Sequence, residues 1–168
     1  MPASELIVLM TLCAGLGTAA VIDMRQRRIP NAVCVATAVA GLALASTGIS
    51  NVSVASALAG LALGLVMMLP GHVLGATGAG DVKLFAAAGT LLGGGRMTSA
   101  FFFVALAGGV LALAIACYRG RLVKTMLMTV QLAVRRGAKR EVMAPAEHNR
   151  FSFGPAIAVG CVIAMLNT

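Results

Sequence analysis

The stretch VASALAGLALGLVMMLPG, residues 54–71, decides the fold class of this chain. It carries no charged residue, and apart from Ser56 every residue before Pro70 is apolar or glycine. A helix needs roughly 20 mostly apolar residues to cross a bilayer. The stretch therefore predicts a membrane-spanning helix that ends where Pro70 and Gly71 interrupt the pattern.

The composition extends this interpretation to the whole chain. Of the 168 residues, 60% are hydrophobic and 11% are charged, and the mean hydropathy is +0.97. A soluble domain carries about 25% charged residues. We therefore expect an all-α integral membrane protein with about six transmembrane helices. We expect these helices to form a single membrane-embedded domain over residues 1–168.

Five further apolar segments supply the remaining spans, at about residues 5–22, 30–48, 81–95, 98–117 and 153–166. Basic residues gather between the first two segments and in a loop at about 118–150, whereas the other loops hold only Arg96. By the positive-inside rule the two basic loops are cytoplasmic, and both chain ends face outward.

The basic loop contains apolar residues at helical spacing between residues 118 and 140. This pattern predicts an amphipathic interfacial helix bound to the anionic inner leaflet. A helix that binds a calmodulin-like partner fits the same pattern.

Two other classes of site are excluded. The net charge of +8 would suit a nucleic-acid partner, but Trp is absent, there is one Tyr, and the basic residues flank apolar segments. We expect no nucleic acid. The cysteines Cys13, Cys34, Cys117 and Cys161 lie inside apolar segments without a CxxC pair. We therefore expect small buried residues, with no metal and no cofactor.

Two aspartates stand out against this background. Asp81 lies in GATGAGDVKL, residues 75–84, and Asp23 ends the first apolar segment. A charge at membrane depth is costly unless it is paired or hydrated, so it indicates function. The topology places both carboxylates at the cytoplasmic side. Two aspartates at one depth can share a proton, so that one activates a water while the other polarises a carbonyl.

The neighbours of the aspartates have structural and functional interpretations. Gly78 and Gly80 leave room before Asp81 for an extended substrate and for a strained helix entry. Lys83 tunes the field of the site or contacts lipid phosphate. Pro30 and Asn31 start a helix and form a wall of the substrate site. Each aspartate also has a local alternative: Asp23 could pair with a nearby arginine, and Asp81 could be a helix N-cap.

Three motifs resemble those of the prepilin peptidases, which are membrane aspartic peptidases of the GxGD type. They are DMRQRRIPN at residues 23–31, GAGDVKL at 78–84 and FSFGPAIAVG at 151–160. The resemblance implies that Asp23 and Asp81 are the catalytic pair and that Gly154 and Pro155 help to shape the site. It implies cleavage of prepilin-like proteins with short basic leaders, at the cytoplasmic face of a bacterial inner membrane.

The resemblance is to the short Tad/Flp-pilus type, related to the CpaA and TadV proteins. Bifunctional relatives carry a cytoplasmic segment with paired CxxC motifs and also methylate the new N-terminus. This sequence has no such zinc or methyltransferase segment, so methylation is not expected. Ser152 stands where many relatives have Pro. Components of pilus or secretion assembly are possible partners.

Two rival functions use the same aspartates differently. A transporter or secretion-channel subunit would use them as a proton relay, and it would need further charged residues across the membrane depth. A structural assembly factor could keep the motifs without activity. The histidines His72 and His148 are interpreted as solvated loop residues.

Overall fold

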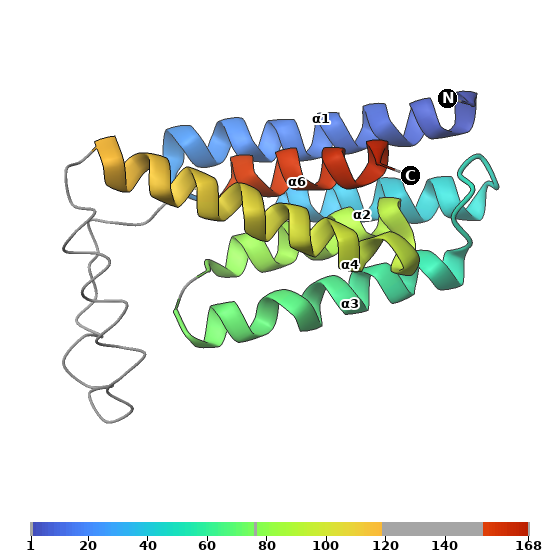
Figure 1. Cartoon of the computed structure of the whole chain (residues 1–168). Helices are drawn as coiled ribbons and strands as arrows, with labels where there is room; N and C mark the ends of the chain where they lie inside the picture. The colour runs from blue at the N-terminus through green and yellow to red at the C-terminus, as the bar shows by residue number, and fades with distance from the viewer. Residues whose placement is uncertain (1, 76, 119–152, 168) are drawn as a thin grey trace. The chain divides into compact units, whose positions relative to one another are not determined.

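The computed structural model describes residues 2–75, 77–118 and 153–167, and every regular element there is an α-helix (Figure 1). The helices are α1 (Ala3–Gln26), α2 (Asn31–Ser46), α3 (Val54–Val73), α4 (Ala79–Tyr118) and α6 (Gly154–Leu166). The all-α prediction is confirmed for these residues. The predicted amphipathic helix, and the basic loop beyond Tyr118, lie outside them.

The chain divides into two compact units. The first comprises residues 1–108 and 152–168, and the second comprises residues 109–151. Within the second unit the structure describes only residues 109–118, the end of α4. The candidate site and the helices that pack around it lie within the first unit. The single-domain interpretation stays a prediction.

In the part of the chain that the structure describes, three stretches of helix are long and apolar enough to cross a membrane, namely α1, α3 and the Ala79–Ala114 part of α4. The helices α2 and α6 are apolar but shorter. This supports an integral membrane protein, while the count of six spans stays a prediction. The helix α4 contains a break at Gly93, which has φ 74° and ψ 165°. The glycines that were predicted to end the fourth segment therefore do interrupt the helix.

The prediction that α3 ends before Pro70 is wrong, because the helix continues to Val73. Proline removes one N–H donor, but its own carbonyl still accepts a bond from the Leu74 amide at 3.0 Å. At the other end, the hydroxyl of Ser53 accepts a bond from the Ser56 amide at 3.2 Å and caps the helix. The extra turn brings His72 into α3.

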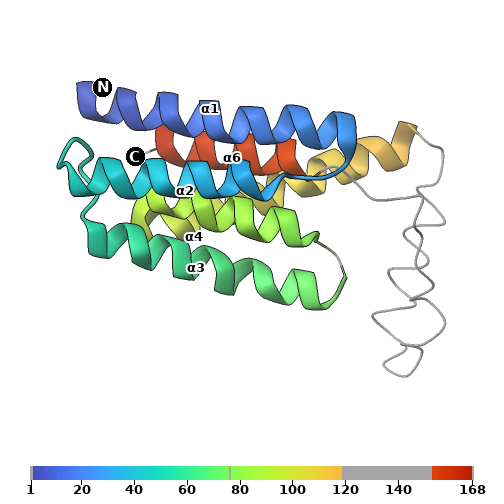
Figure 2. The same ribbon diagram turned by 180° about the vertical axis from the view of Figure 1, so that it is seen from behind.

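The first part of α4 is the centre of the unit. Every residue from Asp81 to Gly93 is buried except Lys83, as expected for a helix that is apolar on all sides. A Cβ added at Gly60 of α3 would collide with the backbone of Gly89. One added at Gly41 of α2 would collide with Thr90. Glycine therefore lets both helices lie directly against this segment (Figure 2).

Candidate active site

Asp23 lies in the last turn of α1, and its side chain is only 6% exposed. Its Oδ2 atom accepts a hydrogen bond from the backbone amide of Gly154 at 3.0 Å. Gly154 is the first residue of α6, where the amides have no partner within the helix. Asp23 therefore joins the end of α1 to the beginning of α6.

Asp81 lies in the first turn of α4 and is 8% exposed. Its Oδ2 atom accepts a bond from the Gly78 amide at 3.0 Å, and its own amide donates to the Gly78 carbonyl at 3.1 Å. The first of these bonds is one half of a capping box, with Gly78 as the N-cap and Asp81 at the third helical position. The alternative that Asp81 is the N-cap is therefore wrong. The helix begins at Ala79, three residues before the position that this alternative requires.

The two carboxylates lie at the same end of the first unit and are close enough to interact electrostatically. The segment between α1 and α2 connects them, because Ile29 packs against Gly80, directly before Asp81. Carboxylates at this range from one another titrate as a coupled pair, and the sharing of one proton between them stays a prediction. The fold thus brings together two residues that are 58 positions apart in the sequence.

The predicted neighbours of the aspartates also gather at this end. Pro30 is the N-cap of α2, and Asn31 is its first residue. The Lys83 ammonium donates a hydrogen bond to Oδ1 of Asn31 at 3.0 Å, and both side chains are exposed. This bond joins the first residue of α2 to the fifth residue of α4. Pro155 is half-buried in the first turn of α6, beside Gly154.

The space at Gly80 is filled by the protein itself. A Cβ at this position would lie 3.1 Å from Cβ of Ile29, and the carbonyl of Gly80 lies 4.0 Å from Sγ of Cys34. Gly80 therefore allows close packing of α4 against the chain that leads into α2. At Gly78, a Cβ would instead lie 3.0 Å from Oδ2 of Asp81, so this glycine leaves room for the carboxylate.

The cysteines are less uniform than predicted. Cys34 and Cys161 are buried, but Cys13 and Cys117 are exposed, and the prediction of burial is wrong for these two. The lipid around a membrane helix is apolar, as a protein core is. A cysteine in an apolar segment can therefore lie on either side of the helix. Within residues 2–75, 77–118 and 153–167, no three side chains of His, Cys, Asp or Glu come together as a metal site.

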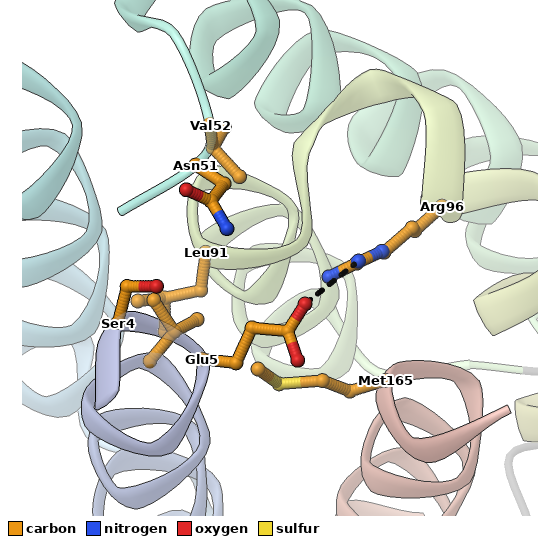
Figure 3. Close-up of a pocket in the computed structure, with 8 residues that line it drawn as sticks. Ser4, Glu5, Asn51, Val52, Leu91, Arg96 and Met165 are labelled. Carbon is orange, nitrogen blue, oxygen red and sulfur yellow. Dashed lines mark ion pairs between the residues drawn. The ribbon is translucent and has the colours of Figure 1, made fainter. Parts of the chain in front are cut away.

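A small pocket lies at the opposite end of the unit and contains neither aspartate. Glu5 of α1 and Arg96 of α4 point toward one another there, with 3.9 Å between Oε1 and the guanidinium Nη2 (Figure 3). Asn51 and Met165 also line it. A partly exposed pair at this distance contributes less than about 1 kcal/mol to stability. Because neither aspartate lines the pocket, it is not the candidate site.

A model of the type IV leader peptidase family matches residues 10–113 of the chain. The chain belongs to the type IV leader peptidase family. Searches of curated proteins and of solved structures found no match. The range matched by the leader-peptidase family contains Asp23 and Asp81, and membership indicates peptidase activity. Gly154 and Pro155 lie beyond this range, although Gly154 is hydrogen-bonded to Asp23.

The sequence interpretation of this leader peptidase missed one residue near the site. His72 was predicted to be a solvated loop histidine. It is exposed, but it belongs to α3, and its Nδ1 atom lies 3.0 Å from the carbonyl oxygen of Thr77, in the loop that precedes Asp81. A single histidine produces no periodic pattern, so only its distance of nine residues from Asp81 could have drawn attention to it.

Proposed function

We propose that this leader peptidase is an aspartic endopeptidase that uses Asp23 and Asp81 to activate water. Its substrates are prepilin-like proteins of the Flp or type IVb kind, from which it removes the short basic leader. It acts in the bacterial inner membrane, with the site facing the cytoplasm. No metal or cofactor takes part.

The observation that carries the proposal is the burial of two carboxylates at one end of the helical unit. Each is held by a glycine amide, Gly154 for Asp23 and Gly78 for Asp81. Such bonds fix the direction of a carboxylate before substrate arrives, which general acid–base catalysis requires. Membership of a peptidase family supplies the reaction class.

The proposed reaction is acyl transfer to water. The ionised aspartate takes a proton from a water molecule as its oxygen attacks the scissile carbonyl carbon, and the protonated aspartate donates a hydrogen bond to the carbonyl oxygen. Collapse of the tetrahedral intermediate breaks the C–N bond. The leaving amine takes a proton from the pair, which returns the two aspartates to their starting state with one proton between them.

The distribution of charge supports this site over a proton relay. In the described part of the chain, charged side chains of α1 and α4 lie near the helix ends or the break, as Asp23 and Asp81 do at one end and Glu5 and Arg96 do at the other. A relay would need ionisable groups between these ends. The buried stretch of α4 from Phe85 to Gly93 contains none.

The location of the site supports a substrate with an apolar stem. The basic residues Arg25, Arg27 and Arg28 directly follow Asp23 and are exposed. They are expected at the cytoplasmic surface by the positive-inside rule. A leader that stops at this surface, while the stem enters the bilayer, would present its cleavage site at the depth of the aspartates.

The proposal is tested by coexpression with a candidate Flp prepilin. Processing is read as a size shift on an immunoblot, and mass spectrometry of the product identifies the cleaved bond and the state of the new N-terminus. We expect cleavage after the basic leader and an unmethylated amine. The Asp81→Asn variant is the matched control, and equal processing by this variant would refute the aspartic mechanism. Absence of processing by the unaltered chain, with its cognate prepilin present, would favour an inactive assembly factor.

A further inference from the structure

One peptide group links His72 to Asp81. The carbonyl oxygen of Thr77 lies 3.0 Å from Nδ1 of His72, and the amide nitrogen of Gly78 lies 3.0 Å from Oδ2 of Asp81. The C=O of Thr77 and the N–H of Gly78 belong to the same peptide unit, which is planar. A rotation of this unit that breaks one bond therefore breaks the other.

The chemistry of the contact sets the tautomer of His72. A carbonyl oxygen can only accept a hydrogen bond, so Nδ1 must carry the proton. The peptide unit is then polarised from both sides, since the imidazole donates to its oxygen and the carboxylate accepts from its nitrogen. Hydrogen bonds in such a chain strengthen one another.

His72 is well placed to hold the loop because it belongs to the last turn of α3. Two backbone bonds connect the same helix end to the loop: the Thr77 amide donates to the Gly71 carbonyl at 3.2 Å, and the Gly75 amide donates to the His72 carbonyl at 2.9 Å. These bonds leave the Thr77 carbonyl to the imidazole. The helix itself is anchored on α4 by the Gly60–Gly89 contact.

We infer that His72 is a positioning residue for Asp81, acting through the Thr77–Gly78 peptide; the inference rests on the proposed catalytic function of Asp81. Without the imidazole bond this peptide can rotate, because Gly78 tolerates a wide range of backbone angles. The Gly78 amide then loses its direction toward Asp81, and the carboxylate loses the contact that orients it. His72 does not touch the substrate.

The test compares two substitutions at His72. In His72→Asn the side-chain amide nitrogen occupies nearly the place of Nδ1 and can donate to the Thr77 carbonyl, whereas His72→Leu removes the donor at similar size. Kinetics are measured on purified enzyme in detergent with a prepilin substrate. We expect His72→Leu to lower kcat roughly tenfold to a hundredfold, as small misplacements of a reacting group do, with KM changed less than about twofold. We expect His72→Asn to recover most of kcat.

A control variant on the same helix separates this effect from a general disturbance of α3. Val73 is 72% exposed, and Val73→Ala should leave kcat and KM unchanged. An unchanged kcat in His72→Leu, or an equal loss in His72→Asn and His72→Leu, would overturn the inference. Failure of the unaltered enzyme to cleave would instead overturn the proposed function.

A measurement without substrate completes the test. The chain has two histidines, so a His148→Gln variant with a histidine-free affinity tag leaves His72 as the single one. Its ¹⁵N spectrum distinguishes the two ring nitrogens. We expect the neutral ring to carry its proton on Nδ1, and a ring protonated on Nε2 alone would overturn the inference regardless of activity.

Discussion

The amide nitrogen of Gly154 lies 3.0 Å from Oδ2 of Asp23, although the two residues are 131 positions apart. The N-cap residue of α6, Phe153, makes no side-chain capping bond. Asp23 supplies the acceptor from another helix, where a negative charge is favoured by the helix dipole. The carboxylate is oriented by the same contact that fixes the beginning of α6, so the last helix and the candidate site are coupled.

This contact leads to the first prediction. In Gly154→Ala, the new Cβ would lie 3.0 Å from Oδ2 and 3.2 Å from Cβ of Asp23, so the carboxylate must shift. We expect kcat for leader cleavage to fall about tenfold or more, with normal accumulation in the membrane. The matched control is Gly17→Ala in α1, where a Cβ meets nothing within 4 Å. Equal activity in the two variants would show that the position of Asp23 is not critical.

The second prediction concerns the pair of carboxylates. Asp23→Asn and Asp81→Asn keep the shape of the side chain and its acceptor oxygen but remove the ionisable group. Each should lower kcat/KM by at least about a hundredfold, measured with the purified enzyme. The double variant should be little worse than either single one, because residues that act as a unit are not additive. Multiplying losses in the double variant would contradict a shared mechanism.

The main helices could be predicted because their signals are local. Long apolar runs define α1 and α3, and glycines such as Gly93 mark the break in α4. The location of Asp23 and Asp81 at one end of the unit was also predictable, since the positive-inside rule places both helix ends on one side. These inferences need only hydropathy, the positions of glycine and proline residues that interrupt helices, and the distribution of basic residues.

The detailed contacts of the site could not be predicted in this way. The bond between Gly154 and Asp23 depends on how α6 packs against α1, and no sequence spacing encodes it. A glycine at position 80 is compatible with the approach of a substrate and with close packing of another side chain. In the structure the side chain of Ile29 packs there. The contact of His72 required the extra turn of α3 beyond Pro70. Each of these depends on tertiary packing.

The third prediction concerns metal and cysteine chemistry. Activity should be unchanged within about twofold by EDTA or by replacement of all four cysteines with alanine, because the proposed dyad needs no Lewis acid. Cys34 is tested separately, because its Sγ lies 4.0 Å from the Gly80 carbonyl, directly before Asp81. A Cys34→Ser variant, which keeps a donor, is therefore compared with Cys34→Ala. Loss of cleavage in EDTA that zinc restores would contradict the dyad.

The fourth prediction concerns packing around α4. A Cβ in Gly60→Ala would collide with the carbonyl of Gly89, so α3 must move away from the central segment. We expect the free energy of unfolding to fall by about 1–3 kcal/mol. Thermal unfolding can be followed with a thiol-reactive dye that reports exposure of the buried Cys34 and Cys161, after the exposed Cys13 and Cys117 are changed to alanine. Gly95→Ala, with nothing within 4 Å, should not lower the midpoint.

The last prediction tests the side of the membrane on which the aspartates lie. Gln26 ends α1 three residues after Asp23, whereas Asn51 lines the pocket at the opposite end, and both residues are exposed. In a cysteine-free background, Asn51→Cys should react with an impermeant maleimide on intact spheroplasts, and Gln26→Cys should react only after lysis. The reason is that Arg25, Arg27 and Arg28 retain the first loop in the cytoplasm. Labelling of Gln26→Cys before lysis would place the dyad on the outer face. A leader kept in the cytoplasm by its basic residues could not reach it there. The proposed cleavage face would then be wrong even if the aspartates are catalytic.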